Sequence, residues 1–264
     1  MSRAITSELR KLLTIRLWWV LLLSMFAYMA FLGVVLGFSL AEGSSMAGDA
    51  GFSIADIAQP VYTLATALGY VFPLVVGTLI VTNEHRHQTL TPTFLFEPRR
   101  GVVLGAKLVV AGGAGVVFGA VGTIGGIAGG LPVLAAKDVP LQLGDSDTWI
   151  AIVMSVVALA LWALVGVGLG SVLPQQVAAI VTILAFTQFV EPILRLGLGS
   201  FDATDGIARF LPGAAAEAIV GSSVFTIGGT LELLTRWQGV LVMIAYVAVL
   251  TLVGRRTTWS RDIT

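Results

Sequence analysis

TWIAIVMSVVALALWALVGVGLGSVLPQQVAAIVTILAFTQFV, residues 148–190, is a run of 43 residues without Asp, Glu, Lys or Arg. A helix that crosses the hydrocarbon core of a bilayer, about 30 Å thick, needs about 20 mostly apolar residues. The run is therefore long enough for two membrane-spanning helices. Leu173-Pro174-Gln175-Gln176 lies near its middle, and this combination of proline with polar residues predicts the turn between them.

Four further uncharged runs, 17–41, 57–83, 108–136 and 237–254, can each hold one span. Only 11% of the chain is charged, against about 25% in soluble proteins. Apolar and polar residues do not alternate as they would in the strands of a membrane barrel. The sequence therefore predicts an all-α integral membrane protein with one transmembrane domain over residues 1–264. The six predicted spans are 17–40, 60–82, 107–131, 149–172, 176–195 and 237–254, with Glu191-Pro192 interrupting the far end of the fifth.

Lys and Arg are distributed unequally between the two sets of loops. The N-terminal segment and the segment 83–107 carry four each, and the C-terminal tail carries three. The loops on the other side carry four in all, and they contain Asp49, Asp56, Asp145 and Asp147. Because Lys and Arg concentrate in cytoplasmic loops, both termini and the loop 83–106 are expected in the cytoplasm, and the segment 196–236 outside.

Residues 2–16 have the pattern of an amphipathic interfacial helix. Apolar residues recur at the spacing of one helical face, and polar residues occupy the other. Ser2 can act as the N-cap. The segment could serve only as a topology anchor, or as an elbow helix that bears on a cytoplasmic partner. The apolar face comprises Ile5, Leu9, Leu12 and Leu13, and the polar face Arg3, Ser7, Arg10, Lys11 and Thr14.

The third span carries a row of glycines separated by steps of 4, 3, 4 and 3 residues, so that all five share one helical face. Such a face lets helices approach closely in lipid. Close packing is the first interpretation, and a smooth face that slides or rotates during transport is the second. The five are Gly115, Gly119, Gly122, Gly126 and Gly129.

Several function classes are disfavoured by what the chain lacks. No Asp, Glu, Lys, Arg or His lies mid-span in the first four spans or the sixth, and ion-driven carriers depend on such residues. No lysine follows a glycine, so the Gly-Lys-Ser/Thr end of a phosphate-binding loop is absent. His85 and His87 are two positions apart and do not share a helix face. The chain is therefore not expected to be an enzyme or to bind a cofactor, a metal ion or nucleic acid.

The segment NEHRHQTLTPTFLFEPRRGVVLGAK, residues 83–107, is basic and also contains the apolar cluster Phe94-Leu95-Phe96. A basic, apolar loop on a membrane protein indicates a docking surface for a soluble partner. Two alternatives remain open. The aromatic side chains could rest on the lipid headgroups, and Arg99 and Arg100 could mainly bind anionic lipid.

Two short signatures resemble a known family. The first is Glu8-x-x-Lys11 followed by Arg16 and Trp18-Trp19; the second is Glu84-His-Arg-His-Gln-Thr89-Leu90, then Pro98-x-Arg100 and Lys107. Over nearly its full length the chain resembles the permease subunits of the type-2 ABC exporter family, of the bacterial kind with separately encoded ATPases. Gln88 stands where the family usually has glycine, which leaves the local turn geometry open.

The resemblance implies an elbow helix over residues 2–16, a coupling helix between spans two and three, and short re-entrant helices before the last span. The re-entrant helices would map to Phe210–Val224, with Pro212 in a first turn. It also implies a dimer with a second permease copy or a paralogue. The dimer would be seated on ATPase subunits that bind ATP and Mg²⁺. The elbow residues would be Glu8, Lys11 and Arg16, and the ATPase-coupling residues Glu84, Arg86, Thr89, Phe94, Leu95, Phe96, Pro98, Arg100 and Lys107.

These expectations define a testable function. A short helix capped by Thr91, with Pro92 at its first position, would place Phe94–Phe96 in a groove of the ATPase, and Pro98 would start a second helix into span three. The chain would then export a hydrophobic or amphipathic substrate across the plasma membrane, surrounded by membrane lipids. The alternative is a channel or a membrane scaffold that needs no ATPase.

Overall fold

The computed structural model describes residues 1–46, 57–87, 89, 93, 97–199, 205–221 and 233–257. Within these ranges all regular secondary structure is helical, and six helical stretches are long and apolar enough to cross a membrane. The prediction of an all-α, multi-pass membrane protein is confirmed at that level. The six stretches are Leu17–Gly43, Ala58–Arg86, Arg100–Ala136, Ser146–Val172, Gln176–Arg195 and Arg236–Thr257.

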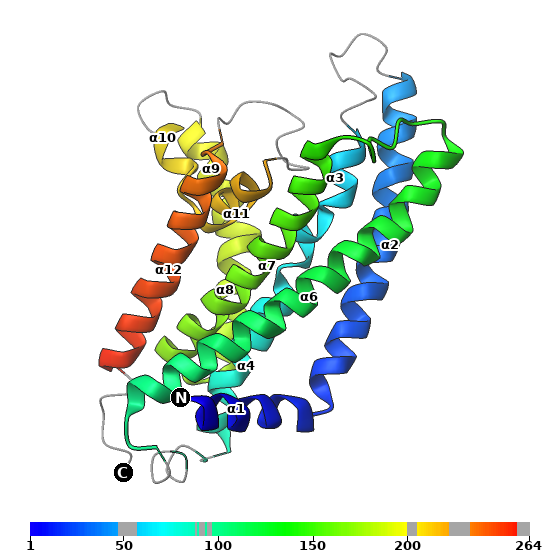
Figure 1. Cartoon of the computed structure of the whole chain (residues 1–264). Coiled ribbons are helices and arrows are strands. Elements are labelled where there is room, and N and C mark those ends of the chain that lie inside the picture. The colour runs from blue at the N-terminus through cyan, green and yellow to red at the C-terminus, as the bar shows by residue number, and fades with distance from the viewer. Residues whose placement is uncertain are drawn as a thin grey trace.

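The long helices run side by side, and short helices gather at one end of the bundle (Figure 1). The described elements, in chain order, are α1 (Ser2–Thr14), α2 (Leu17–Met46), α3 (Ala58–Tyr62), the π-helix η2 (Ala65–Gly69), α4 (Val71–Arg86), α6 (Arg100–Ala136), α7 (Ser146–Val172), α8 (Gln176–Ala185), the π-helix η3 (Phe186–Val190), α9 (Glu191–Gly199), α10 (Asp205–Ala208), α11 (Pro212–Val220) and α12 (Arg236–Thr257).

The segment predicted as a cytoplasmic loop, 83–106, is helical at both ends. Helix α4 continues through Glu84 to Arg86, and α6 begins at Arg100. The prediction that Pro98 starts a helix is wrong, because Pro98 lies two residues before the first turn and Arg99 occupies the N-cap position. Uncharged runs mark the apolar part of a helix only, so they miss charged turns at its ends.

The second and fifth spans each contain a π-helical turn. Pro73 lies in the first turn of α4, directly after η2, and Pro192 lies in the first turn of α9, directly after η3. A proline in a first turn sacrifices no intrahelical hydrogen bond, and π turns are tolerated as local insertions in helices. The expectation that Glu191-Pro192 interrupts the fifth span is therefore wrong, since the chain remains helical through Gly199.

Helix α7 lies at the centre of the core. Its Trp162 is completely buried and stacks on Tyr70, with ring centroids 4.6 Å apart. Helices α4, α6, α11 and α12 all pack against α7. Trp162, the largest fully buried side chain, thus joins the fourth span to the second, although the two spans lie far apart in the sequence.

The glycine face of α6 packs against three neighbouring helices, α7, α2 and α3. A Cβ atom on Gly115 would lie 2.7 Å from the Cα atom of Ala160 in α7, and one on Gly119 would lie 3.0 Å from the carbonyl oxygen of Val156. Toward the other end, a Cβ atom on Gly129 would collide with the carbonyl oxygen of Ala30 in α2. Gly122 lies against the Met25 side chain, and Gly126 lies against the carbonyl oxygen of Val61. The absence of side chains is thus used for close helix approach.

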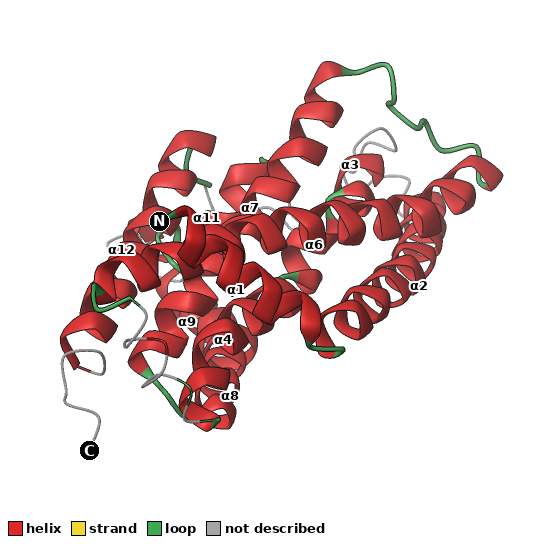
Figure 2. Cartoon of the chain, turned by 60° about the horizontal axis from the view of Figure 1, so that its bottom comes forward, coloured by secondary structure: helices red, strands yellow, loops and turns green. Residues whose placement is uncertain are grey.

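Helix α1 lies across one end of the bundle, crosswise to the long helices (Figures 1 and 2). Met1, not Ser2, occupies its N-cap position, and no side chain caps it. The prediction of a Ser2 cap is therefore wrong. Ile5 and Leu12 face inward in part, whereas Leu9 and Leu13 are exposed. Two of the four apolar residues of α1 are therefore partly buried, and the other two are exposed on the surface of the protein.

At the opposite end, α11 is buried beside α7 and α12. Pro212 lies in its first turn, as expected, and the helix ends at Gly221, whose φ of 84° is the left-handed conformation that favours glycine. Of the predicted segment Phe210–Val224, residues 222–224 lie outside the described ranges. Helix α11 is thus a short helix that precedes the last span in the chain.

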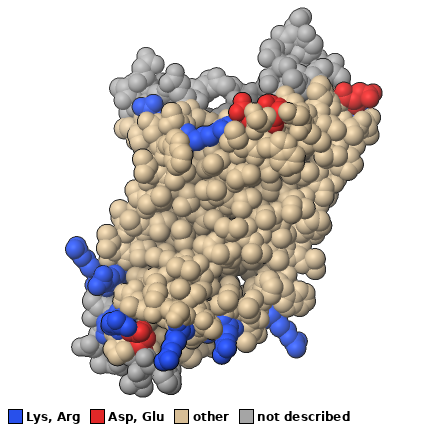
Figure 3. Space-filling model, viewed as in Figure 1, with Lys and Arg blue, Asp and Glu red and all other residues tan. Residues whose placement is uncertain are grey.

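Charged side chains gather at the two ends. On the face shown in Figure 3, Lys and Arg cluster at the end that contains α1, and an uncharged belt separates them from the other end. That belt corresponds to the apolar central parts of the six stretches. An uncharged belt between charged ends is what a bilayer requires of a spanning bundle.

Candidate functional site

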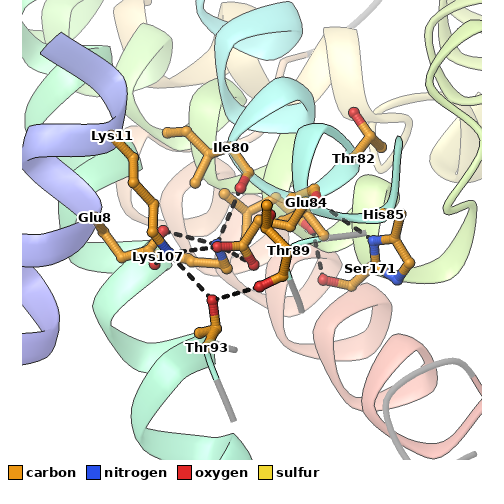
Figure 4. A network of polar contacts seen from close by, with 12 residues as sticks. Glu8, Lys11, Ile80, Thr82, Glu84, His85, Thr89, Thr93, Lys107 and Ser171 are labelled. Atoms are coloured by element: carbon orange, nitrogen blue, oxygen red, sulfur yellow. Dashed lines mark hydrogen bonds and ion pairs between the residues drawn. The ribbon is translucent and has the colours of Figure 1, made fainter. Parts of the chain in front are cut away.

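Four charged side chains from three helices meet at the end of the bundle that contains α1 (Figure 4). Glu8 and Lys11 come from α1, Glu84 from α4 and Lys107 from α6. The Nζ atom of Lys11 lies 2.6 Å from Oε1 of Glu8 and 2.5 Å from Oε1 of Glu84. The Nζ atom of Lys107 lies 2.7 Å from Oε2 of Glu8 and 2.9 Å from Oε2 of Glu84. Each carboxylate therefore bridges both ammonium groups, and the four form a closed ring without net charge, hereafter the charge ring.

Local helical geometry places each member. Glu8 and Lys11 are three residues apart, so they share one face of α1. Glu84 lies in the last turn of α4, and Lys107 lies in the second turn of α6. The crosswise position of α1 brings its inner face over both helix ends. The side chain of Lys107 is completely buried, and both carboxylates are almost completely buried.

Each lysine also makes one hydrogen bond to a group outside the ring. Lys107 donates to the carbonyl oxygen of Ile80 at 3.1 Å, and Lys11 donates to Oγ1 of Thr93 at 3.4 Å. An ammonium group has three N–H donors. Lys11 has an acceptor for each of them, whereas Lys107 donates to Glu8 and Ile80 only, and its contact with Oε2 of Glu84 is an ion pair without a hydrogen bond. Buried charges are tolerated in proteins when they are paired and hydrogen-bonded in this way.

The pKa of Lys11 is raised by its carboxylate partners. Partial burial of the ammonium group is the largest single effect and would lower the pKa, but hydrogen bonds and attraction from Glu8 and Glu84 together outweigh it. Lys11 therefore remains charged throughout the neutral range. The ion pairs of the charge ring hold three helices together at this end of the bundle.

The connection between α4 and α6 is tied to the same ring. The backbone N–H of Thr89 donates to the carbonyl oxygen of Glu84 at 3.0 Å, and the hydroxyl of Thr93 donates to the carbonyl oxygen of Thr89 at 2.9 Å. Thr93 also accepts the hydrogen bond from Lys11. One polar network thus joins α1, the end of α4, the connecting segment and the start of α6.

The other residues predicted at this end lie around the ring without joining it. Arg86 donates to Oε1 of Gln176 in α8 at 3.4 Å. Arg16 is exposed in the turn between α1 and α2, Pro98 is exposed before α6, and Arg100 is half-buried at the start of α6. The predicted docking cluster Phe94–Phe96 and the predicted helix start at Thr91 and Pro92 lie outside the described residues.

Sequence reasoning singled out all four ring members but did not pair them. It also placed Lys11 on the polar face of α1, where Lys11 lies with Arg3, Ser7, Arg10 and Thr14 along one surface hollow, and its ammonium group reaches Glu84 from there. The hydroxyl of Thr93 and the carbonyl group of Ile80 were missed. A backbone carbonyl acceptor has no sequence signal, whereas the four-residue spacing of Thr89 and Thr93 could have indicated a shared helical turn.

A second buried charge cluster lies at the opposite end of the bundle. Arg195 of α9 is 2.6 Å from Oε1 of Glu191 and 2.9 Å from Oε1 of Glu217 in α11. Oε1 of Glu191 also accepts the backbone N–H of Ala214 at 3.0 Å. These contacts attach the short helix α11 to the end of the fifth span.

The fold and the charge ring define a multi-pass helical membrane protein in which a crosswise N-terminal helix is held by buried ion pairs. Comparison of the sequence with models of known protein families and with curated proteins found no match.

Proposed function

We propose that the chain is the permease subunit of an ATP-driven exporter of the type-2 ABC family, with ATP and Mg²⁺ bound by a separate ATPase subunit. In this proposal the protein lies in a bacterial plasma membrane with both termini and the segment 83–106 in the cytoplasm. Helix α1 is the elbow helix, the segment between α4 and α6 carries the coupling helix, and α11 is a re-entrant helix.

The observation that carries the proposal is the charge ring. It joins the end of α4 to a crosswise helix and to the start of a span through contacts of 2.5–2.9 Å between buried or half-buried groups. Lys11 adds a hydrogen bond of 3.4 Å to Thr93 in the segment between α4 and α6. A partner that pushed on this segment would therefore move α1, α4 and α6 together. Rigid-body displacement of packed helices is an established form of switching transition.

Two further features support the same assignment. The end that contains α1 is rich in Lys and Arg (Figure 3), as cytoplasmic ends of membrane proteins are. Apolar residues such as Phe31, Leu241 and Val249 are exposed on α2 and α12, which leaves apolar helix surface for lipid and for a second permease copy or a paralogue. A largely uncharged bundle suits a hydrophobic or amphipathic substrate.

Affinity purification tests the proposal. The tagged wild-type chain is expected to recover an ATPase subunit from its native cell, with vanadate-sensitive ATP hydrolysis in the recovered complex. Phe94→Asp is expected to abolish recovery, because a carboxylate in an apolar groove would be buried without a partner. Phe94→Leu, which keeps an apolar side chain, is the matched control and should retain recovery.

The alternatives give different results. Recovery of an ATPase by Phe94→Asp at the wild-type level would contradict docking through this cluster and favour contact of its aromatic side chains with lipid. Failure of the wild-type chain to recover any ATPase, together with ion conduction by the purified chain in vesicles, would favour an ATPase-independent channel.

A further inference from the structure

A pocket of about 290 Å³ lies between α1, the start of α2 and α4. It borders the charge ring but extends away from it into the bundle. Its deeper wall consists of apolar side chains from all three helices, namely Leu12 of α1, Leu21 of α2, and Val76 and Leu79 of α4. The volume is at the lower end of the range for small-molecule sites, about 300 Å³ and above.

The polarity of the pocket changes along α4. Val76 and Leu79 line its deeper part, and Asn83 and His87 line the end next to the connection between α4 and α6. The rise of about 1.5 Å per residue places Asn83 about 10 Å from Val76 along the helix axis. The change from apolar to polar therefore runs along a spanning helix, in the same direction as the change from acyl chains to headgroups in one leaflet.

The pocket is bordered by exposed apolar side chains. Leu13, Ile15 and Leu17, at the turn between α1 and α2, are between 39% and 53% exposed. In a bilayer such side chains lie at the boundary between headgroups and acyl chains. An acyl chain from the same leaflet can therefore reach the pocket without crossing a polar surface.

The accessible charge at the polar end is positive. Glu8 and Glu84 line the pocket, but both are almost completely buried and paired with lysines. The side chain of Lys11 is 39% exposed, and Arg16 is exposed next to the lining residues Ile15 and Leu17. The half-buried side-chain amide of Asn83 makes no hydrogen bond to the described part of the chain.

We propose that this pocket binds one acyl chain of an anionic glycerophospholipid from the leaflet that contains α1. The phosphate group accepts hydrogen bonds from Arg16 and the amide of Asn83 and lies near the positive charge of Lys11, and the acyl chain lies against Leu12, Leu21 and Val76. The remainder of the lipid stays in the bilayer, which agrees with the modest volume. Such a lipid contacts α1 and α4 simultaneously and so links leaflet composition to the helices that the charge ring joins.

Native mass spectrometry of the purified full-length chain tests this proposal without any ATPase. The probes are phosphatidylglycerol and phosphatidylcholine with identical acyl chains. The wild-type chain is expected to bind one phosphatidylglycerol at least ten-fold more tightly than phosphatidylcholine. Leu21→Trp, which fills the pocket, should reduce phosphatidylglycerol binding about ten-fold, and Arg16→Gln should remove the preference for the anionic lipid.

The matched control is Leu23→Trp, because Leu23 is 62% exposed on the same helix and does not line the pocket. It should bind like the wild type. Asn83→Leu provides a second pocket variant that leaves the charge ring intact, in case Leu21→Trp does not fold. Equal binding of the two lipids by the wild type, an equal loss in Leu23→Trp, or unchanged binding in Asn83→Leu and any folded Leu21→Trp would overturn the proposal.

Discussion

The ammonium nitrogen of Lys107 lies 2.7 Å from Oε2 of Glu8, although 99 positions separate the two residues in the chain. This contact places the first helix against the start of the third span. Since the ammonium group is completely buried, it has no access to water as a substitute for its partners. The position of α1 is therefore determined by buried charges as well as by its apolar residues.

Removal of Lys107 should destabilise the protein strongly. In Lys107→Met, the carboxylates of Glu8 and Glu84 remain buried with only Lys11 to neutralise them. Breaking a buried pair from one side costs about 3–5 kcal/mol, and we expect a loss of this size in the free energy of unfolding in detergent.

The matched control for this loss is Lys137→Met. Lys137 pairs with Glu42 at the opposite end, where both side chains are substantially exposed, and exposed pairs contribute about 1 kcal/mol or less. The double variant Glu8→Gln with Lys11→Gln removes one charge of each sign and should lose less stability than Lys107→Met. Equal losses in Lys107→Met and Lys137→Met would contradict a structural role for the charge ring.

The attachment of α1 should not change with pH across the neutral range. The pKa of Lys11 is raised above its ordinary value of 10.5. Its contribution to stability is therefore fully present below that value and is lost as the pH rises through the raised pKa. The chain has no cysteine, so spin labels at Ser7→Cys in α1 and Gly101→Cys in α6 can report the distance between these helices. We expect a constant distance from about pH 6 to 9, well below the pKa of a lysine; a change near pH 6.5 would instead implicate a histidine.

Close packing of α6 on α2 should make Gly129 intolerant of any side chain. A methyl group there would collide with the carbonyl oxygen of Ala30, and overpacking of this kind costs about 1–3 kcal/mol. Gly113 lies on the same helix with open space around its Cα atom. Gly129→Ala should therefore lower the unfolding temperature while Gly113→Ala leaves it unchanged or raises it, and the reverse order would refute the packing described for this face.

The cluster of Glu191, Arg195 and Glu217 should be sensitive to the shape of the cation as well as to its charge. Arg195 donates to Glu191 through two nitrogens and to both carboxylate oxygens of Glu217. Arg195→Met should cost about 3–5 kcal/mol because two buried carboxylates lose their partner. Arg195→Lys should recover only part of this, since an ammonium group lacks the planar fork. Full recovery of the unfolding free energy by lysine would show that charge alone is required.

The six spans could be predicted because the absence of charge over about 20 residues is a local property that the bilayer selects directly. Their ends could not, because charged turns such as Arg100–Lys107 continue a helix for reasons that lie in its neighbours. The π turns were equally out of reach, since they depend on how a helix meets the surrounding bundle and not on a residue pattern.

For the candidate site, too, features encoded by neighbouring residues could be predicted, and contacts between residues far apart in the chain could not. Glu8, Lys11, Glu84 and Lys107 could be selected because each belongs to a short signature. Their mutual pairing depends on the crosswise placement of α1, which no spacing within residues 2–16 specifies. The pairing of Lys11 with Glu84 could not be predicted, because Glu84 lies 73 positions away, where helical periodicity gives no information.

The charge ring divides into two neutral halves along the boundary between α1 and the bundle. Glu8 and Lys11 belong to the same helix and already form a pair, and Glu84 and Lys107 remain paired with each other. Withdrawal of α1 would therefore leave each carboxylate paired with one lysine and would strand no isolated charge in the apolar interior. The contact between α1 and the bundle can thus open as a unit at far lower electrostatic cost than the loss of any single charged residue of the ring. Separation of α1 from the bundle is therefore reversible.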